Sequence, residues 1–471
     1  MMITAKEVSE AIGAKLPSGI RPEDEFSAAI SRADEIKSGC LFFPHSENKL
    51  EGAFEKGAKA VVSTKTVNEG PCFIVEDITK AAFSLSEYIY SKHDKLPAVL
   101  ITGSEGKTTT TQFINEVLSK KYNPFYARGN YNTIYCLFHV LRNLKKENDY
   151  FIFETDESRN SKLISKVLAP RIVCMTNMLN SHISDVGSQE KINDGVAGAA
   201  AYLQKDGFAI INLDDPESSK YKFDCNVISI GIENKSATYI AENIKESSKS
   251  TKFDIMYDGK KTRIKILHPG IHNIYNAMMA FIVGKKEGIS DRKIKKAIKS
   301  YRPRGIRQNI IKGKGRILYV DCFNTNATSV AFALRTFSNI PVKKGKRVAV
   351  IGDMGHIEGY EEEVYKSMAK AVDSSSIDIL ITYGEKSSMI EKNLTKDVEY
   401  YHVRTSDELR GLLREIDAKD GRNYLFKAGR GLKLEETVKE VFPEFIRKSE
   451  ERERKRDRIA SIKKRYLPFL K

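Results

Sequence analysis

A short glycine-rich run carries the strongest chemical signal in the sequence. It consists of Gly103, Ser104, Glu105, Gly106, Lys107, Thr108 and Thr109. It lies between apolar residues 97–101 and an amphipathic stretch, where a strand would turn into a helix. Glycines let backbone N–H groups surround phosphate oxygens, and the helix start adds partial positive charge. Lys107 would then reach the β- and γ-phosphates of a nucleotide, and Thr108 would hold Mg²⁺. The alternative is a tight turn with a surface lysine.

The elements that must position this run form an alternating series. Further apolar segments, which we expect to be buried strands, lie at 150–154, 171–177, 207–215 and 226–232. Helical segments separate several of them, and this alternation predicts an α/β domain with a mainly parallel sheet. Residues 250–268 alternate more strongly between polar and apolar side chains. They predict a β-rich edge.

At 471 residues the chain is too long for one ordinary core. Residues 1–94 indicate a small α/β domain, with strands at 41–43 and 59–63 and a helix at 49–56 between them. Residues 95–302 indicate a central domain that carries the glycine-rich run. A Pro/Gly hinge at 302–305 precedes a Rossmann-like domain at 303–443, whose strands we expect at 316–321, 347–353, 377–384 and 423–429. Residues 444–471 form a basic tail that we expect to be helical.

The charge and the cysteine content of the chain indicate which partners it binds and in which compartment it works. The formal net charge is +16, and the tail alone has 11 Lys/Arg against 5 Asp/Glu. Aromatic residues do not interleave with these charges, so we expect no nucleic acid and instead a small anionic substrate. The six cysteines lack a CxxC spacing, which favours reduced thiols in the cytoplasm. We find no secretory signal and no apolar run near the ~20 residues that cross a bilayer.

The glycine-rich run, as TGxxGKTT, resembles the loop of the Mur ligase family. Matching segments follow it in the same order along most of the chain. They are Gly129-Asn130-Tyr131-Asn132, Glu154, Thr176-Asn177 with His182, Gly187-Ser188-Gln189-Glu190, and the box Gly270-Ile271-His272-Asn273-Ile274-Tyr275-Asn276-Ala277. The resemblance implies three domains: a small N-terminal α/β domain for a UDP-sugar-like acceptor, a central P-loop ATPase-like domain with a mainly parallel sheet, and a C-terminal Rossmann-like domain.

Within the family, the MurF branch is the most similar. The segments that carry this assignment are Ile30 to Phe42, Asp321-Cys322-Phe323-Asn324-Thr325-Asn326, Gly352-Asp353-Met354 and 427–435. The branch implies an ADP-forming acid–amino-acid ligase of peptidoglycan (cell wall) biosynthesis. With ATP and Mg²⁺ it would add D-Ala-D-Ala, or a similar amino acid or dipeptide, to a UDP-muramoyl-peptide carboxylate through an acyl phosphate.

The resemblance also implies a role for individual residues. Catalytic roles fall on Lys107, Glu154 and His182, and magnesium ligation on Thr108, Glu154 and His182. Nucleotide contacts fall on Gly103, Ser104, Glu105, Gly106, Lys107, Thr108, Thr109, Asn273, Asn276, Arg307 and Asp321. Substrate contacts fall on Ser31, Arg32, Asn130, Asn132, Lys427 and Arg430.

Some positions depart from the family pattern. Val196 stands where many members carry a carbamylated lysine, which leaves Asp156 and Glu157 as candidate replacements for that negative group. Ile30 replaces an aspartate, and a longer loop after residues 41–43 is missing. Two alternatives therefore remain: a Mur-like ligase for a carboxylate outside peptidoglycan, or a weakly catalytic nucleotide-binding partner subunit. We expect a monomer whose basic tail is a solvated helix, although the tail could contact anionic lipid.

Overall fold

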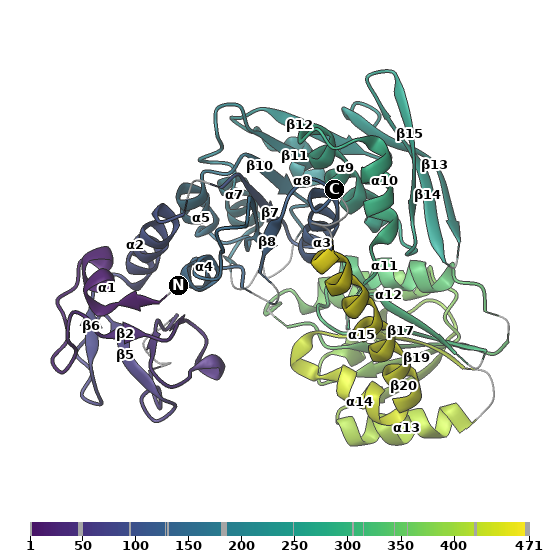
Figure 1. Ribbon diagram of the computed structural model, residues 1–471. Helices are drawn as coiled ribbons and strands as arrows, with labels where there is room; N and C mark the ends of the chain where they lie inside the picture. Colours follow the sequence, from purple (N-terminus) through teal and green to yellow (C-terminus); the bar gives the residue numbers. More distant parts are fainter. Residues whose placement is uncertain are drawn as a thin grey trace.

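The computed structural model describes residues 2–45, 50–93, 96–127, 129, 131–179, 186–247, 249–303, 306–313, 315–342, 344–355, 357–418 and 422–466. Three sheets follow one another along the chain, and Figure 1 shows them as three bodies coloured purple, blue to teal, and green to yellow. We refer to residues 2–93 as the N-terminal unit, 96–303 as the central unit and 306–466 as the C-terminal unit. The expected α/β class is confirmed.

The N-terminal unit contains a small parallel sheet. Its strands are paired in the order β3 (Ala29–Ile30), β4 (Cys40–Phe42), β5 (Ala58–Ser63) and β6 (Cys72–Ile74), beside the antiparallel pair β1 (Ile3–Thr4) and β2 (Glu25–Phe26). Two helices accompany them, α1 (Ala5–Ile12) and α2 (Ile78–Ser91). The helix that the sequence predicts at 49–56 is wrong for its described part, because residues 51–57 form turns. Gly52 and Gly57 adopt φ of 69° and 103°, which interrupt a right-handed helix.

The central unit is built on a nine-stranded sheet in the order β15-β14-β13-β12-β11-β10-β7-β9-β8. The pairings from β13 (Tyr239–Ser247) to β8 are parallel. Beyond β13, the antiparallel strands β14 (Ser250–Tyr257) and β15 (Lys260–Ile266) form the β-rich edge that the sequence predicts at 250–268. The other strands are β7 (Ala98–Thr102), β8 (Pro124–Tyr126), β9 (Tyr150–Glu154), β10 (Ile172–Met175), β11 (Phe208–Asn212) and β12 (Val227–Gly231). The helices are α3 (Lys107–Leu118), α4 (Ile134–Leu141), α5 (Ser161–Leu168), α7 (Gln189–Gly198), α8 (Pro216–Lys220), α9 (His272–Lys286) and α10 (Asp291–Ser300).

The C-terminal unit has a six-stranded sheet in the order β16-β17-β21-β18-β19-β20, parallel except for β16. Its strands are β16 (Asn309–Gly313), β17 (Arg316–Asp321), β18 (Arg347–Gly352), β19 (Ile379–Tyr383), β20 (Glu399–Val403) and β21 (Asn423–Lys427). Its helices are α11 (Ala327–Ser338), α12 (Glu361–Asp373), α13 (Ser406–Ala418), α14 (Leu434–Val441) and α15 (Pro443–Tyr466).

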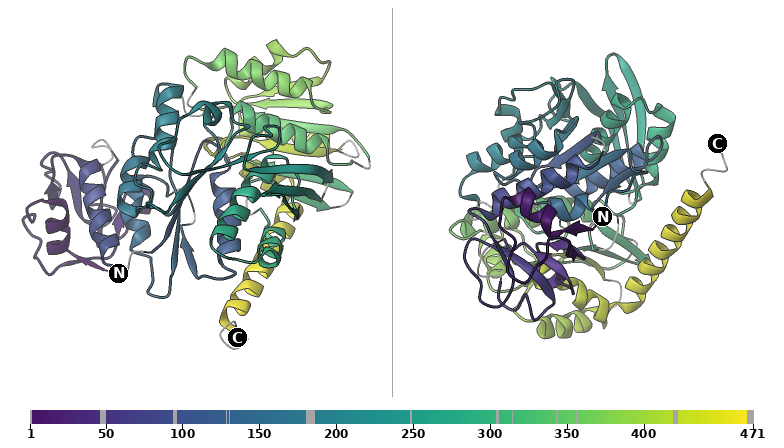
Figure 2. Two further views of the ribbon diagram at one scale, coloured as in Figure 1. Left: turned by 90° about the horizontal axis from the view of Figure 1, so that it is seen from above. Right: turned by 60° about the vertical axis from the view of Figure 1, so that its left-hand side comes forward.

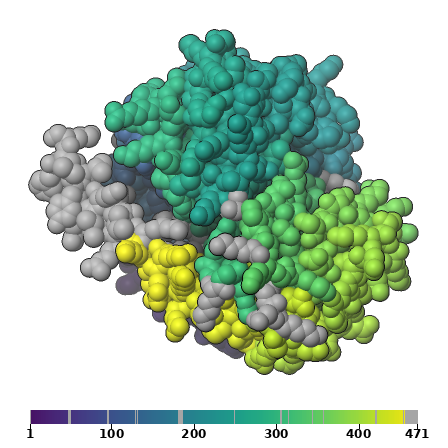
Figure 3. Space-filling view, turned by 90° about the vertical axis from the view of Figure 1, so that its right-hand side faces the viewer, coloured from purple at the N-terminus to yellow at the C-terminus, as the bar shows by residue number. Residues whose placement is uncertain are grey.

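The part of the tail that the structure describes, up to Tyr466, is helical, as the sequence predicts. The base of α15 packs against β16, where Phe445 is buried over Gly313 and Ser449 accepts a hydrogen bond from Asn309 at 3.0 Å. Beyond this base the helix leaves the body of the molecule, which both views of Figure 2 show. In Figure 3 its yellow surface lies below the teal central unit and beside the green C-terminal unit. No helix among the described residues is both long enough and apolar enough to span a membrane.

The hydrophobic cores do not coincide with the sheets. One cluster joins the N-terminal sheet, α2 and one face of the central sheet, and it includes Leu41, Leu85 and Leu100. A second cluster fills the other face of the central sheet, around α3 and α9. The larger clusters of the C-terminal unit contain only residues of that unit. The first two sheets are therefore held together by apolar packing.

Candidate active site

The glycine-rich run forms a loop between β7 and α3, at the carboxyl end of a buried strand. Gly103 and Gly106 have φ of 114° and 85°, which L side chains rarely adopt. A Cβ on Gly103 would also lie 2.3 Å from Thr176 Oγ1, and one on Gly106 would lie 2.7 Å from Asn276 Oδ1. The loop therefore passes too close to its neighbours to carry side chains there. This backbone, at the start of α3, fits a phosphate group.

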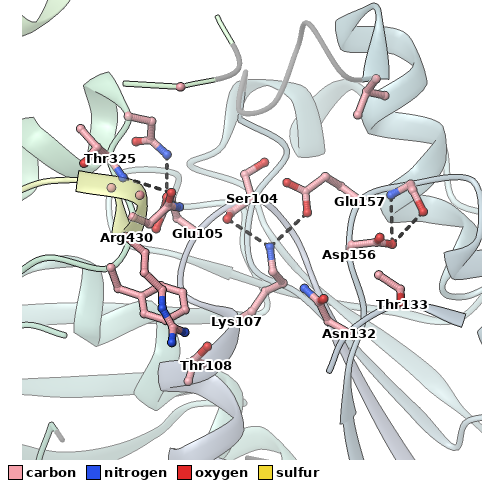
Figure 4. Close-up of a pocket in the computed structure, with 18 of the residues that line it drawn as sticks. Ser104, Glu105, Lys107, Thr108, Asn132, Thr133, Asp156, Glu157, Thr325 and Arg430 are labelled. Atoms are coloured by element: carbon pink, nitrogen blue, oxygen red, sulfur yellow. Dashed lines mark hydrogen bonds and ion pairs between the residues drawn. The ribbon is translucent and has the colours of Figure 1, made fainter. Parts of the chain in front are cut away.

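Lys107 is the first residue of α3, and its ammonium group turns back over the loop. It donates hydrogen bonds to the carbonyl oxygens of Gly103 and Ser104, and it lies 3.1 Å from Glu157 Oε2 (Figure 4). Burial alone would lower the pKa of Lys107, but the Glu157 carboxylate offsets this effect and raises it. The ammonium group is thus charged and held at the place where phosphate would be bound.

Thr108 and Glu154 form the next pair. The Thr108 hydroxyl donates to Glu154 Oε2 at 3.0 Å, at the end of β9. Burial raises the pKa of Glu154, and it raises the pKa of nearby Asp156 to about 6. Asp156 accepts hydrogen bonds from the backbone N–H and the hydroxyl of Ser158. The hydroxyl and the carboxylates are hard oxygen donors of the kind that Mg²⁺ prefers.

A large cleft opens from the loop, with a volume of about 1580 Å³, and all three units line it. The N-terminal unit contributes Arg32, and the central unit contributes Asn132 beside the loop. The C-terminal unit contributes Arg430 and Arg307, and the two guanidinium groups lie 5.6 Å and 3.4 Å from the centre of the Phe323 ring. The cleft can therefore bring anionic groups from three directions to the phosphate loop.

A smaller pocket of about 290 Å³ lies on the other side of the loop, between the central and C-terminal units. Thr109, His272, Asn276, Arg307, Asp321 and Lys427 are among the residues that line it. Asn276 accepts from Thr110 at 3.0 Å, and Asn273 donates to Gln308 at 3.2 Å. Asp321 accepts from the Gln308 backbone at 3.1 Å. A flat group next to phosphates would fit this position.

The structure separates some residues that the sequence grouped. Lys427 is 2% exposed, pairs with Asp321 at 3.2 Å and lines the smaller pocket, whereas Arg430 faces the cleft. Ser31 is buried, with its hydroxyl 3.3 Å from Cys136 Sγ. His182 and Asn130 lie outside the described residues.

Three contacts were missed by reasoning from the sequence. Gln308 joins Asn273 to Asp321, and Phe323 lies under both arginines of the cleft. Glu105 accepts hydrogen bonds from the side chains of Asn324 and Asn326. The asparagines belong to a segment that the sequence had singled out, but nothing in their spacing points to Glu105. Val196 is fully buried in the core beneath α7.

Comparison with known families finds two matching domain models. Residues 101–284 match the Mur ligase middle domain, and residues 306–430 match the Mur ligase glutamate ligase domain. The chain belongs to the Mur ligase family. Among curated members of this family, the UDP-N-acetylmuramoyl-tripeptide–D-alanyl-D-alanine ligase of Bacillus subtilis is 27% identical, over 93% of this chain and 98% of its own length.

Solved Mur ligase structures have the same fold. MurF from Acinetobacter baumannii superposes with a TM-score of 0.80 at 20% identity, covering 94% of this chain and 99% of its own. MurF from Thermotoga maritima, solved in complex with ADP, gives a TM-score of 0.72 at 20% identity and covers 89% and 98% of the two chains. The three-sheet architecture is therefore that of a Mur ligase.

Proposed function

We propose that this chain is an ATP-dependent, ADP-forming ligase of the MurF type, which joins D-Ala-D-Ala or a similar dipeptide to a UDP-muramoyl-peptide carboxylate. The observation that carries the proposal is the cleft, in which one phosphate loop faces side chains from all three units. Similarity to MurF over nearly the whole chain supports the same substrates. Because residues of one chain line the cleft on all sides described, we also propose that the protein works as a monomer. The free cysteines support a cytoplasmic location.

We assign one substrate to each unit. Residues 1–94 would bind the acceptor, with Arg32 facing the cleft, and residues 95–302 would bind ATP on the loop. Residues 303–443 would bind the incoming amine, with Arg430 available for its carboxylate. These boundaries and roles are proposals, supported by the residues that line each cavity.

The chemistry follows from the cost of joining a carboxylate to an amine in water. ATP would phosphorylate the acceptor carboxylate, the amine would attack the acyl phosphate, and phosphate would leave from the tetrahedral intermediate. Lys107 and the loop amides would offset charge on the transferring phosphoryl group and hold it in line. Magnesium, when bound, would offset further phosphate charge, and Thr108 and Glu154 are the described residues that fit it.

Phosphate release from ATP tests this function. The enzyme would be assayed with UDP-muramoyl tripeptide as acceptor, with and without D-Ala-D-Ala. Turnover that requires both would support the proposal. Turnover only with another carboxylate would favour a Mur-like ligase outside peptidoglycan, and ATP binding without turnover would favour a partner subunit.

Substitution of Lys107 tests the loop itself. We expect Lys107→Ala to lower kcat by roughly 10³-fold or more, because the transferring phosphoryl group loses a buried positive charge. The control is Lys205→Ala, which removes an exposed lysine of the same unit. Near-normal phosphate release by the Lys107 variant would sink the ATP-ligase proposal.

A further inference from the structure

A carboxylate inside a phosphate loop needs an explanation. Glu105 lies between the two glycines of the loop and lines both the cleft and the smaller pocket. A negative side chain there would repel phosphate if it pointed at the ligand. Burial raises the pKa of Glu105, and the charges of Lys427, Lys107 and Arg307 offset part of this effect. The direction of the Glu105 side chain therefore decides its role.

Glu105 points at the C-terminal unit. Its Oε1 accepts a hydrogen bond from Asn324 Nδ2 at 2.6 Å and another from Asn326 Nδ2 at 2.5 Å. In Figure 4 the side chain lies on the side of the pocket that carries Thr325, and the Lys107 ammonium points instead to Ser104 and Glu157. Two loop neighbours thus face different partners.

Both ends of this contact are held rigidly. The Glu105 backbone exchanges two hydrogen bonds with the Asn177 side chain, at 2.9 Å and 3.1 Å. On the other side, Asn326 Oδ1 caps α11 by accepting from Ser329 N at 2.7 Å, and Asn324 Oδ1 accepts from Thr325 N at 3.0 Å. Because both amide oxygens are engaged, both amide N–H₂ groups are directed at Glu105.

We propose that Glu105 is a positioning residue that clasps the C-terminal unit to the phosphate loop, through Asn324 and Asn326, and so holds the cleft closed. The contact joins residues 221 positions apart and spans the junction between two units whose larger cores are separate. Breaking it releases Asn324 and Asn326 from the loop while the backbone cradle for phosphate remains. This proposal depends on the proposed function only in one measurement, the kcat of the ligation reaction.

The sharpest test replaces the hydrogen-bond donor at position 326 by an acceptor, and then restores a donor at position 105. Asn326→Asp keeps the helix cap, because a carboxylate oxygen still accepts from Ser329, but it places a second negative charge against Glu105. We expect the radius of gyration by small-angle X-ray scattering to rise and kcat to fall roughly tenfold or more. The Kd for ATP should rise by a smaller factor, because the loop keeps its backbone cradle for phosphate while Arg307 and Asp321 move away with the C-terminal unit. Adding Glu105→Gln restores a donor opposite the new carboxylate at position 326, and we expect it to recover the compact form and most of kcat.

The matched control is Asn143→Asp, at an exposed amide whose Nδ2 donates a hydrogen bond to His139 O within the same segment. Thermal unfolding of every variant separates opening from misfolding. The clasp is overturned if Asn326→Asp leaves scattering and kcat unchanged, if it abolishes ATP binding, or if the double variant is no better than the single one. Scattering and ATP binding need no acceptor, so they test the clasp even if the proposed ligation fails.

Discussion

At the scale of single residues, the Glu157 carboxylate competes with the phosphates of a nucleotide for the ammonium group of Lys107. Glu157 is 6% exposed and lies 3.1 Å from the ammonium group that phosphate would need. Removing the Glu157 carboxylate releases the Lys107 ammonium group from this ion pair. The same change also leaves the buried positive charge of Lys107 without its anionic partner.

We therefore expect Glu157→Gln to bind ATP about three- to tenfold more tightly in the presence of EDTA, and to unfold at a lower temperature when ligand is absent. Calorimetric titration and thermal unfolding measure the two effects. The exposed carboxylate Glu69, changed to Gln, is the control. Weaker metal-free binding in Glu157→Gln would show that the carboxylate positions Lys107 and does not compete with phosphate.

Asp156 gives a prediction on pH. Burial raises its pKa to about 6, whereas an unfolded aspartate titrates near about 3.9. Between these two pKa values the native state holds a proton that the unfolded chain has lost. The stability of the native state relative to the unfolded chain is therefore highest at low pH, and it falls as the pH rises through 6. We expect Asp156→Asn to raise the free energy of unfolding, by a gain that grows from about pH 4 to pH 7 and then stays level at about 3 kcal/mol or less. Denaturant titration across this range measures it. A gain independent of pH, or one matched by exposed Asp397→Asn, would contradict this cause.

At the scale of elements, α7 packs directly on the segment that carries Glu157. A Cβ on Gly195 would lie 1.8 Å from the Glu157 carbonyl oxygen, so this helix position must be glycine. Alanine usually stabilises an exposed helix by about 1 kcal/mol relative to glycine. At Gly195 the close contact with Glu157 makes the same change destabilising.

We expect Gly195→Ala to lower the free energy of unfolding by about 1–3 kcal/mol and to reduce phosphate release, because Glu157 must move. Gly411→Ala in α13 is the matched control, since nothing lies within 4 Å of its added Cβ. That variant should be slightly more stable and fully active. Denaturant titration and the phosphate assay measure both, and a stabilised, active Gly195 variant would show that the helix shifts freely.

Local sequence was enough to predict the elements that position the site. A buried strand, a glycine turn and a helix in direct succession left little freedom for Gly103 to Thr109. The turns at 51–57 were missed because two glycines outweighed an otherwise helical pattern. Partners far apart in sequence, such as Glu105 with Asn326 or Lys107 with Glu157, were not predictable. Their meeting depends on how the units close and on how α7 supports the end of β9.

At the scale of the whole molecule, the continuous core beneath α2 couples two units. Leu85 of α2 is fully buried in the cluster that also contains residues of the N-terminal and central sheets. Leu334 of α11 is equally buried, in a cluster confined to the C-terminal unit. Loss of either side chain should cost about 2–5 kcal/mol. The two substitutions should destabilise different units of the chain.

Hydrogen exchange followed by mass spectrometry can locate them. We expect Leu85→Ala to increase exchange in both β5 and β7, because one core supports both strands, and to leave β18 protected. Leu334→Ala should do the reverse, since the two larger clusters of the C-terminal unit contain only residues of that unit. If Leu85→Ala loosened β5 alone, the N-terminal unit would have its own core, and α2 would act as a simple linker. Coupled loosening would mean that the acceptor side of the cleft and the phosphate loop form one body, so that closure is a movement of the C-terminal unit against both.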